Sequence, residues 1–363
     1  MSYATQKLRD ISVIKTGKLD SNAAVENGAY PFFTCDPQTL RINKWAYDTE
    51  AVLLAGNNAS GNYTAKYYRG KFNAYQRTYI IEAADSERLS VRFLCYAINQ
   101  QLRLLKAISS GSTTKFLTIR MLHNLDIPCP EIEVQDRIVN VLGTIDDLIE
   151  NNQKQIKLLE EAARRLYKEW FVNFRFPGYE DTPIVDGVPE GWADGTLGDI
   201  AVFKRGKTIT KAQVSDGNIP VVAGGLEPAY YHNKANTTAP LITVSASGAN
   251  AGFTRLYNID VFASDCSYID SNSTPFLLFV YCFLKTNAMK LNSLQKGSAQ
   301  PHVYAKDLNA LVLSVPSEGV LTAFCGIVSP YFERIRLLQR ENEIAAQARD
   351  RLLPKLMSGE IEV

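Results

Sequence analysis

The most constraining feature of this sequence is that its second half repeats its first half. Residues 8–18 align with residues 197–207 at an offset of 189, and seven of the eleven aligned positions are identical. Farther along the chain the offset falls to 186, where Arg165-Leu166 matches Arg351-Leu352. Because the matches keep the same order in both halves, the sequence predicts two copies of one fold related by pseudo-twofold symmetry.

Each half begins with a mixed segment and ends in a long helix. Short apolar and β-branched runs bounded by glycine and asparagine predict strands, and apolar residues at helical spacing predict short helices. The predicted strands include 51–55, 78–82 and 241–245, and the predicted short helices include 93–98, 102–105 and 276–284. The predicted fold class is α+β, with two similar mixed α/β globular domains.

The long helices are predicted from heptad-like apolar stripes. One stripe runs from Val134 to Phe171, the other runs from Val320 to Leu356, and proline precedes both. A helix of the first length spans about 57 Å at 1.5 Å per residue. Such a helix is unstable in water unless its stripe is covered, so we predict a long antiparallel two-helix coiled coil that separates the two domains. In the alternative, each helix packs only on its own globular domain, which is too small to cover the stripe.

These patterns predict five segments. A stretch rich in proline, glycine and acidic residues marks the connection between the halves. The predicted segments are the first globular domain at 1–130, the first helix at 131–176, a linker at 177–192, the second globular domain at 193–316, and the second helix with a tail at 317–363.

Net charge is nearly zero for the chain but differs between its parts. The total is +1, from 39 basic and 38 acidic residues, yet residues 1–130 carry 16 basic and 10 acidic side chains. Residues 181–316 carry 10 basic and 11 acidic side chains. The first globular domain therefore has the sign of a nucleic-acid binder, whereas the second could present only a local basic patch.

Other composition features exclude several classes of protein. No apolar run reaches 18 residues and the N-terminus lacks a signal-peptide pattern, so we expect no membrane span and a cytoplasmic location. The six cysteines form no C-x-x-C pair, so we expect neither a disulfide framework nor a metal site. Of the three histidines, we expect His123 to be structural, whereas His232 and His302 stand in polar segments where they could contact a ligand.

Three segments outside the globular domains resemble a known family. They are residues 169–178, with the sequence EWFVNFRFPG, residues 188–192, with VPEGW, and residues 352–361, with LLPKLMSGEI. Together with the alternation of variable domains and long helices, they resemble the specificity subunit of type I restriction-modification systems. The resemblance covers essentially the whole chain.

The resemblance implies a function and partners. Each globular domain would be a target recognition domain that reads one half of a split, asymmetric site in double-stranded DNA. The helices would fix the gap between the half-sites and dock two adenine methyltransferase subunits, and restriction-motor subunits would complete the complex. The chain itself would hold no cofactor and perform no chemistry, and S-adenosylmethionine would be bound by the partner methyltransferase subunits.

Catalytic motifs are missing from the sequence. We find no phosphate-binding loop of the G-x-x-x-x-G-K-[ST] type, and no Asn/Asp-Pro-Pro-aromatic loop with a glycine-rich partner as an adenine methyltransferase would need. These gaps argue against a stand-alone methyltransferase and against a motor.

Two polar loops in each domain are the candidate base-reading segments. Small residues let backbone approach a groove, and asparagine can pair with both hydrogen-bonding groups of adenine. For the first loop of each domain the alternative is an ordinary glycine and asparagine turn, which the pattern alone favours. The candidates in the first loops are Asn57, Asn58, Ser60 and Asn62, matched by Ser245, Ser247 and Asn250; those in the second loops are Thr113, Thr114 and Lys115, matched by Lys296, Ser298, Gln300 and His302.

Basic residues outside these loops are candidate phosphate contacts. The candidates that we assign to DNA binding are Lys44, Lys66, Arg77 and Lys234. Taken singly, each of them is more often just solvated surface.

A second class of function stays open. In this alternative the chain is a non-catalytic coiled-coil scaffold whose paired domains bind protein or glycan, as the neutral second domain allows. Co-purification with an adenine methyltransferase, followed by sequencing of methylated adenines, distinguishes the two.

Overall fold

The chain is known from a computed structural model that describes residues 3–111, 113–295 and 301–363. It divides into two compact units. Unit 1 is Met1–Asn151 with Glu341–Val363, and unit 2 is Asn152–Arg340. Each unit contains one globular domain together with a segment of both long helices.

A six-stranded sheet forms the centre of unit 1. Its strand order is β2-β8-β5-β7-β3-β4, and all neighbours are antiparallel except β3 and β7, which are parallel. Two short pairs, β1 with β10 and β6 with β9, lie outside it. The strands are β1 Thr5–Lys7, β2 Ser12–Thr16, β3 Tyr30–Phe33, β4 Leu40–Ile42, β5 Tyr47–Ala55, β6 Asn57–Asn58, β7 Ala65–Ala74, β8 Thr78–Ala83, β9 Lys115–Phe116 and β10 Asp126–Pro128.

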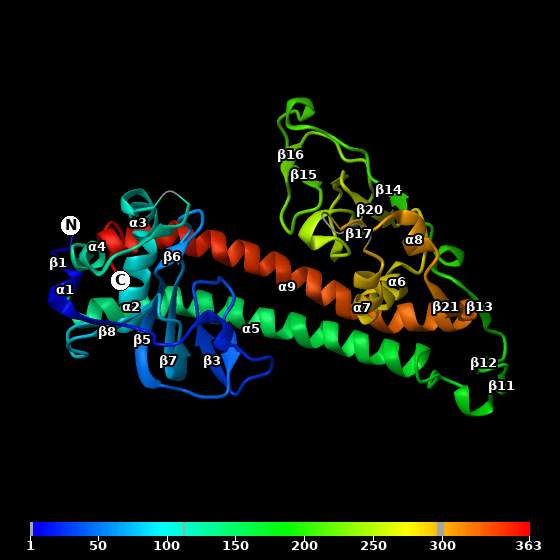
Figure 1. Cartoon of the computed structure of the whole chain (residues 1–363), viewed down its shortest axis with the longest axis horizontal. Coiled ribbons are helices and arrows are strands. Elements are labelled where there is room, and N and C mark those ends of the chain that lie inside the picture. The colour runs from blue at the N-terminus through cyan, green and yellow to red at the C-terminus, as the bar shows by residue number, and fades with distance from the viewer. Residues whose placement is uncertain (1–2, 112, 296–300) are drawn as a thin grey trace. The chain divides into compact units, whose positions relative to one another are not determined.

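Helix α2 covers this sheet with an apolar face, and seven of its ten residues are apolar and buried. Ser90 caps it by accepting a hydrogen bond from the backbone N–H of Phe93. Phe93, Leu94 and Ile98 are fully buried in one cluster with Val52 and Leu54 of the sheet. Figure 1 shows α2 beside β5 and β7. The globular helices of unit 1 are α1 Leu8–Ile11, α2 Val91–Gln100, α3 Leu102–Ile108 and α4 Ile119–His123, with a 3-10 turn at Ser21–Ala23.

Unit 2 repeats this order of strands in two separate sheets. The first has the order β14-β20-β17-β18 and the second has the order β16-β15-β19. The ten-residue β7 of unit 1 corresponds to two short strands here, because residues 258–261 interrupt the pairing between β18 and β19. The strands are β11 Ile184–Val185, β12 Val188–Pro189, β13 Ala193–Thr196, β14 Lys204–Arg205, β15 Ile219–Val222, β16 Tyr230–His232, β17 Leu241–Ser245, β18 Thr254–Tyr257, β19 Phe262–Ala263, β20 Cys266–Asp270 and β21 Val312–Val315.

Helix α6 takes the place in unit 2 that α2 takes in unit 1. Phe279, Val280 and Leu284 of α6 are fully buried in the main cluster of the unit. The globular helices of unit 2 are α6 Leu277–Thr286, α7 Ala288–Ser293 and α8 Ala305–Asn309, with 3-10 turns at Tyr179–Asp181, Leu197–Asp199, Lys211–Gln213 and Gly248–Asn250.

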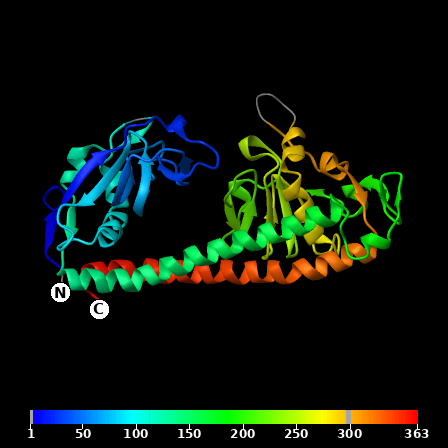
Figure 2. The same cartoon turned by 90° about the horizontal axis from the view of Figure 1, so that it is seen from below.

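The two long helices are α5, Ile132–Phe171, and α9, Glu318–Ser358, of 40 and 41 residues. In unit 1, the guanidinium of Arg137 donates to the backbone oxygen of Val363, and Arg349 pairs with Asp146 at 2.9 Å. The earlier α5 residue, Arg137, contacts Val363, and the later one, Asp146, contacts Arg349 of α9. Residue numbers therefore rise along one segment and fall along the other, so the two segments are antiparallel. In each unit the globular part lies to one side of its helix segments (Figure 2).

In unit 2 the same two helices meet through an aromatic cluster. The Phe324 ring of α9 lies 6.2 Å from Tyr167, 5.8 Å from Trp170 and 5.0 Å from Phe171 of α5 (ring centroids). Early residues of α9 thus pack on late residues of α5. The predicted fold class, its duplication and its pair of long antiparallel helices are confirmed.

The segments that carry the family resemblance contain residues that pack against the ends of the long helices or in the core of unit 1. The Trp192 ring lies 5.3 Å from the Phe176 ring and 5.9 Å from the Phe171 ring (centroids), so the chain after α5 folds back onto the end of that helix. Between them, a β11–β12 hairpin turns at Asp186 and Gly187, whose φ angles of 51° and 88° are those of a two-residue hairpin turn. At the end of α9, Leu356 and Met357 are buried in the core of unit 1.

No helix among the residues that the structure describes is long and apolar enough to cross a membrane.

Candidate nucleic-acid interface

The two candidate loops of unit 1 lie together. The N–H of Gly56 donates to the backbone oxygen of Arg77 at 2.8 Å, and the N–H of Leu117 donates to the oxygen of Gly56 at 2.8 Å. Strand β6 then pairs with β9, so that Asn57 is opposite Phe116. We call this surface the unit 1 loop edge: residues 56–62, 75–77, 109–111 and 113–117.

Unit 2 builds the same arrangement with equivalent backbone groups. The N–H of Ala246 donates to the oxygen of Asp265 at 3.2 Å, and the N–H of Val303 donates to the oxygen of Ala246 at 3.0 Å. Ser247 forms an isolated bridge with His302. The unit 2 loop edge comprises residues 246–252, 264–265 and 301–303.

The matched hydrogen bonds define which side chains are equivalent. Asn57 corresponds to Ser247 and Phe116 to His302, because each pair sits opposite one another in its bridge. Arg77 corresponds to Asp265, because each accepts the first hydrogen bond of the loop. Each of the three positions therefore keeps its backbone role while its side chain changes. The change is from amide to hydroxyl at the first position, from phenyl to imidazole at the second, and from cation to anion at the third.

Some candidate side chains of unit 1 hold the loop itself. The Asn58 side-chain oxygen accepts hydrogen bonds from the N–H groups of Ser60 and Asn62, at 2.9 and 3.1 Å, and from the Ser60 hydroxyl. The Asn62 side-chain oxygen accepts from the Lys106 ammonium at 2.7 Å. For Asn58 the turn alternative thus has direct support.

Other candidates of unit 1 are available for contact. Arg77, Thr113 and Thr114 are exposed and Lys115 is half-buried. The side-chain oxygen of Asn57 is buried and has no hydrogen-bond partner among the described residues. A buried amide oxygen without a donor is costly, but a partner cannot reach this oxygen in the conformation described.

In unit 2 the first candidate loop is held by its own contacts. Ser245 is buried, and its hydroxyl donates to the backbone oxygen of Gly224 at 3.2 Å. The Asn250 amide reaches the same oxygen at 3.4 Å. The Ser247 hydroxyl donates to the Asp265 carboxylate, which Arg205 also binds at 2.7 Å.

The second candidate loop of unit 2 is only partly described. Lys296, Ser298 and Gln300 lie outside the described residues. His302 is half-buried, and its ring stacks on Tyr304 with centroids 5.9 Å apart and planes 11° apart. This flat pair is typical of surfaces on which bases stack.

Two candidate cations lie away from the loop edges. Lys44 follows β4 and Lys234 follows β16, and both are exposed. Lys44 precedes the start of β5, whereas the loop edge begins where β5 ends. The register of the sheet therefore separates Lys44 from the candidate loops.

Lys66 and its counterpart fix a neighbouring loop. The Lys66 ammonium donates to the Thr39 hydroxyl at 3.1 Å and lies 3.4 Å from the backbone oxygen of Asp36. In unit 2, Arg255 donates to the backbone oxygen of Leu226 at 2.9 Å. Burial lowers the pKa of Lys66, an effect that the charge of Asp36 opposes. The recurrence of this contact indicates a structural role.

The expectation for His232 is wrong. This residue lies in β16 and is 9% exposed, with its Nδ1 accepting a hydrogen bond from the N–H of Ser215 at 3.0 Å and its ring edge on Phe262. Alternation along the strand turns it inward although its neighbour Tyr231 is exposed. Among the described residues no group of histidine, cysteine or carboxylate side chains could hold a metal ion.

Comparison with known families identifies the group to which the chain belongs. The family described as "Type I restriction modification DNA specificity domain" matches residues 2–161 and, a second time, residues 189–344. These matches cover most of the chain and reproduce its duplication. The chain belongs to this family. The resemblance inferred from the sequence is thereby confirmed.

Individual relatives carry the name of specificity subunits. The chain is 33% identical over 178 residues to the type I restriction enzyme EcoDI specificity subunit of Escherichia coli, a match that covers 49% of this chain and 38% of that relative. It is 30% identical over 286 residues to the MjaIX specificity subunit of Methanocaldococcus jannaschii, covering 71% of this chain and 66% of the relative. The chain thus spans less than two thirds of the length of either relative.

A solved structure has the same fold. The crystal structure of the type I restriction-modification system S subunit from M. genitalium matches with a TM-score of 0.62 at 19% identity, over 98% of this chain and 96% of that one.

Sequence reasoning missed several residues of the loop edges. Phe116 is 39% exposed and lies opposite Asn57, yet an isolated phenylalanine after a polar loop carries no signal for a ligand. Asp265 and Arg205 form an ion pair across 60 residues of sequence. Only the equivalence of the two specificity domains, seen through their hydrogen bonds, brings these residues into the candidate site.

Proposed function

We propose that the chain is a non-catalytic DNA-recognition subunit in which each loop edge reads one half of a bipartite, asymmetric site. The observation that carries this proposal is the pairing of a shared backbone arrangement with different side chains at the three equivalent positions. A fold that presents variable side chains from a fixed frame suits two domains that read two different sequences.

The chemistry of the unit 1 loop edge suits both kinds of DNA contact. Exposed Arg77 can bind phosphate or the acceptor edge of guanine, and Thr113 and Thr114 supply hydroxyl groups. In unit 2, Arg205 would contact phosphate or guanine, and the His302–Tyr304 pair would stack on a base.

The long helices complete the proposal. They would set the gap between the half-sites and dock two adenine methyltransferase subunits, which would bind S-adenosylmethionine. Restriction-motor subunits would join the assembly, which would act in the cytoplasm. The heptad-like repeat of both helices supports a spacer, because adding equal numbers of heptads preserves the buried stripe.

The decisive experiment is sequencing of methylated adenines in cells that produce this chain with a methyltransferase subunit. We expect a split motif that disappears when the chain is deleted. The triple variant Asn57→Ser, Arg77→Asp, Phe116→His gives unit 1 the unit 2 side chains and should change or abolish only one half-site. Arg120→Asp, an exposed cation on α4, is the matched control and should leave the motif unchanged.

A second arm tests the spacer. Inserting one heptad into each helix should lengthen the unread gap and leave both half-sites unchanged. Altered half-sites in the insertion variant contradict the spacer. An unchanged methylome on deletion of the chain, with no DNA retention at low salt, favours the scaffold alternative.

A further inference from the structure

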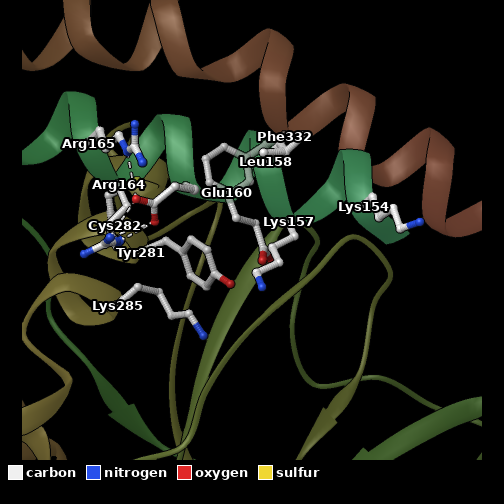
Figure 3. A pocket seen from close by; sticks show the side chains of 11 residues that line it. Lys154, Lys157, Leu158, Glu160, Arg164, Arg165, Tyr281, Cys282, Lys285 and Phe332 are labelled. Carbon is white, nitrogen blue, oxygen red and sulfur yellow. Dashed lines mark hydrogen bonds and ion pairs between the residues drawn. The ribbon is translucent and has the colours of Figure 1, made fainter. Parts of the chain in front are cut away.

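A groove of about 600 Å³ lies on unit 2 between α5, α6 and α9. Its floor contains the residues Tyr281, Cys282 and Phe332, which are 8%, 3% and 7% exposed. Figure 3 shows Tyr281 and Lys285 of α6 facing the α5 side chains across the groove. Leu158 of α5 stands at its edge with 69% of its surface exposed. A cavity of this size with an apolar floor is large enough to take several side chains of a partner.

The rim of the groove is basic. Five lysine or arginine side chains line it against two glutamates, an excess of three positive charges. Glu161 is already paired, since Arg164 and Arg165 bind it at 2.7 and 2.8 Å and their hydrogen bonds lower its pKa. Burial raises the pKa of Glu160, against the influence of Lys285. The rim therefore attracts anions while the floor favours apolar groups.

Unit 1 has a cavity of about 510 Å³ in the equivalent place, with the opposite charge. Four carboxylates line it against two arginines. At the offset of 186, Asp146 stands where unit 2 has Phe332, Asn99 where it has Lys285, and Asp350 where it has Arg164.

Charged side chains that line the unit 1 cavity are paired with other residues of unit 1. Asp146 accepts from the Tyr96 hydroxyl at 2.5 Å and pairs with Arg349 at 2.9 Å. Arg92 pairs with Asp147 at 2.6 Å. The polar groups of the unit 1 cavity are thus satisfied by the chain itself, whereas the unit 2 groove presents an apolar floor under a cationic rim.

We propose that the unit 2 groove binds an amphipathic helix of a partner protein, with apolar side chains on the floor and carboxylates on its flanks against Lys157 and Lys285. A helix that places apolar residues three and four apart on one face can lay that face into a groove between helices. The unit 1 cavity does not bind the same helix, because its carboxylates repel those flanks. The two helix surfaces of this duplicated chain are therefore unequal docking sites. The inference rests on the proposed function in one respect: the partner protein is taken to be a subunit of the proposed restriction-modification assembly.

The test uses the full chain and a defined probe. The probe is a labelled 18-residue helical peptide with leucine along one face and glutamate on both flanks, and its partner probe has lysine in place of glutamate. We expect the acidic peptide to bind at least tenfold more tightly at low salt, measured by fluorescence anisotropy. Lys157→Glu with Lys285→Glu should weaken its binding at least tenfold and bring the two peptides close to equal affinity.

Matched controls separate the groove from general charge. Lys290→Glu makes the same change on α7 outside the groove and should leave binding unchanged. Leu158→Gln tests the apolar part with no charge change and should weaken both peptides. Circular dichroism of each variant verifies that the helices remain folded.

Three results would overturn the proposal. They are equal affinity for the acidic and basic peptides, equal losses in Lys290→Glu and the double variant, and a double variant that loses DNA affinity while keeping the peptide. The last result would make the groove a phosphate site. Peptide binding by a chain that associates with neither DNA nor a methyltransferase would support the proposed groove and refute the proposed function. A split methylation motif without peptide binding would support the proposed function and refute the proposed groove.

Discussion

The loop edges of unit 1 and unit 2 share backbone hydrogen bonds but carry different side chains. The N–H of Gly56 and the N–H of Ala246 make the first hydrogen bond of their loop edges in the same way, yet the residues that accept it are Arg77 and Asp265. Side chains that leave the backbone role intact are free to diverge. Under the proposed function, these positions would account for the difference in recognition between the two domains.

Buried positions of the long helices behave in the opposite way. At the offset of 186, Ile138 and Phe324 are equivalent, and both are fully buried. Leu142 and Val328 are equivalent and fully buried as well. Apolar burial restrains these positions because a polar group there would lack a partner. The exposed walls of the grooves have no such restraint and have acquired opposite charges.

The largest expected effect compares the two helix contacts directly. Phe324→Ala should destabilise unit 2 by about 3–5 kcal/mol, since it opens a cavity in the core. It also removes ring contacts to Tyr167, Trp170, Phe171 and Phe279, and such pairs contribute beyond buried area. Ile138→Ala in unit 1 should cost less, about 2–4 kcal/mol, because no ring pairs are lost. Denaturant unfolding, followed by hydrogen exchange in each unit, measures the stability loss of both variants. A larger stability loss for Ile138→Ala than for Phe324→Ala would contradict this prediction.

The second prediction concerns DNA binding by the loop edges. Arg77→Ala should remove one phosphate or base contact, weaken DNA binding by about 1–3 kcal/mol and reduce the slope of log affinity against log salt by about 0.9. Asp265→Asn, at the equivalent position, should leave the slope unchanged, because a carboxylate releases no counterion from DNA. Filter binding from low to moderate salt measures both slopes. Equal slope changes in the two variants would contradict a direct contact between Arg77 and DNA.

Much of the fold could be predicted from the sequence because it repeats. The strands at 51–55 and 241–245 lie within β5 and β17, and the stripes from Val134 and Val320 became α5 and α9. Periodicity reports which face is buried, so it suffices for such elements. It does not report how a long strand is divided, so the separation of β18 from β19 was not foreseen.

The candidate site was predicted in part. The loop residues Asn57 and Lys115 and the cation Arg77 do lie together, although nothing in the sequence joins them. The contact of Lys66 with the 36–39 loop, by contrast, depends on side-chain geometry that no pattern encodes. Its DNA role stays a prediction.

The third prediction compares the two loop-fixing cations. Arg255→Met and Lys66→Met keep the aliphatic stem and remove the charge, so each loses its hydrogen bonds to the neighbouring loop, at a cost of about 1 kcal/mol. Lys66→Met should cost less, because burial already disfavours the Lys66 cation and lowers its pKa. Arg255 also lies 5.1 Å from the Tyr257 ring, a contact that methionine replaces only partly. Thermal unfolding of the two variants checks the order, which a larger loss for Lys66→Met would reverse.

The smallest expected effect concerns the carboxyl group in the unit 2 groove. Burial raises the pKa of Glu160 above its ordinary value of 4.5, with Lys285 acting against the shift. A carboxyl whose pKa is higher in the folded chain lowers stability once pH rises through that pKa, and it has no such effect below the unfolded value. Glu160→Gln should therefore raise the unfolding temperature slightly at pH 7 and leave it unchanged below pH 4.5. Asp146, which lines the unit 1 cavity, supplies the contrast. It pairs with Arg349, so Asp146→Asn should lower stability at pH 7. Stabilisation in both variants would show that the two cavities share one electrostatic character, and the distinction between the docking surfaces would then fail with it.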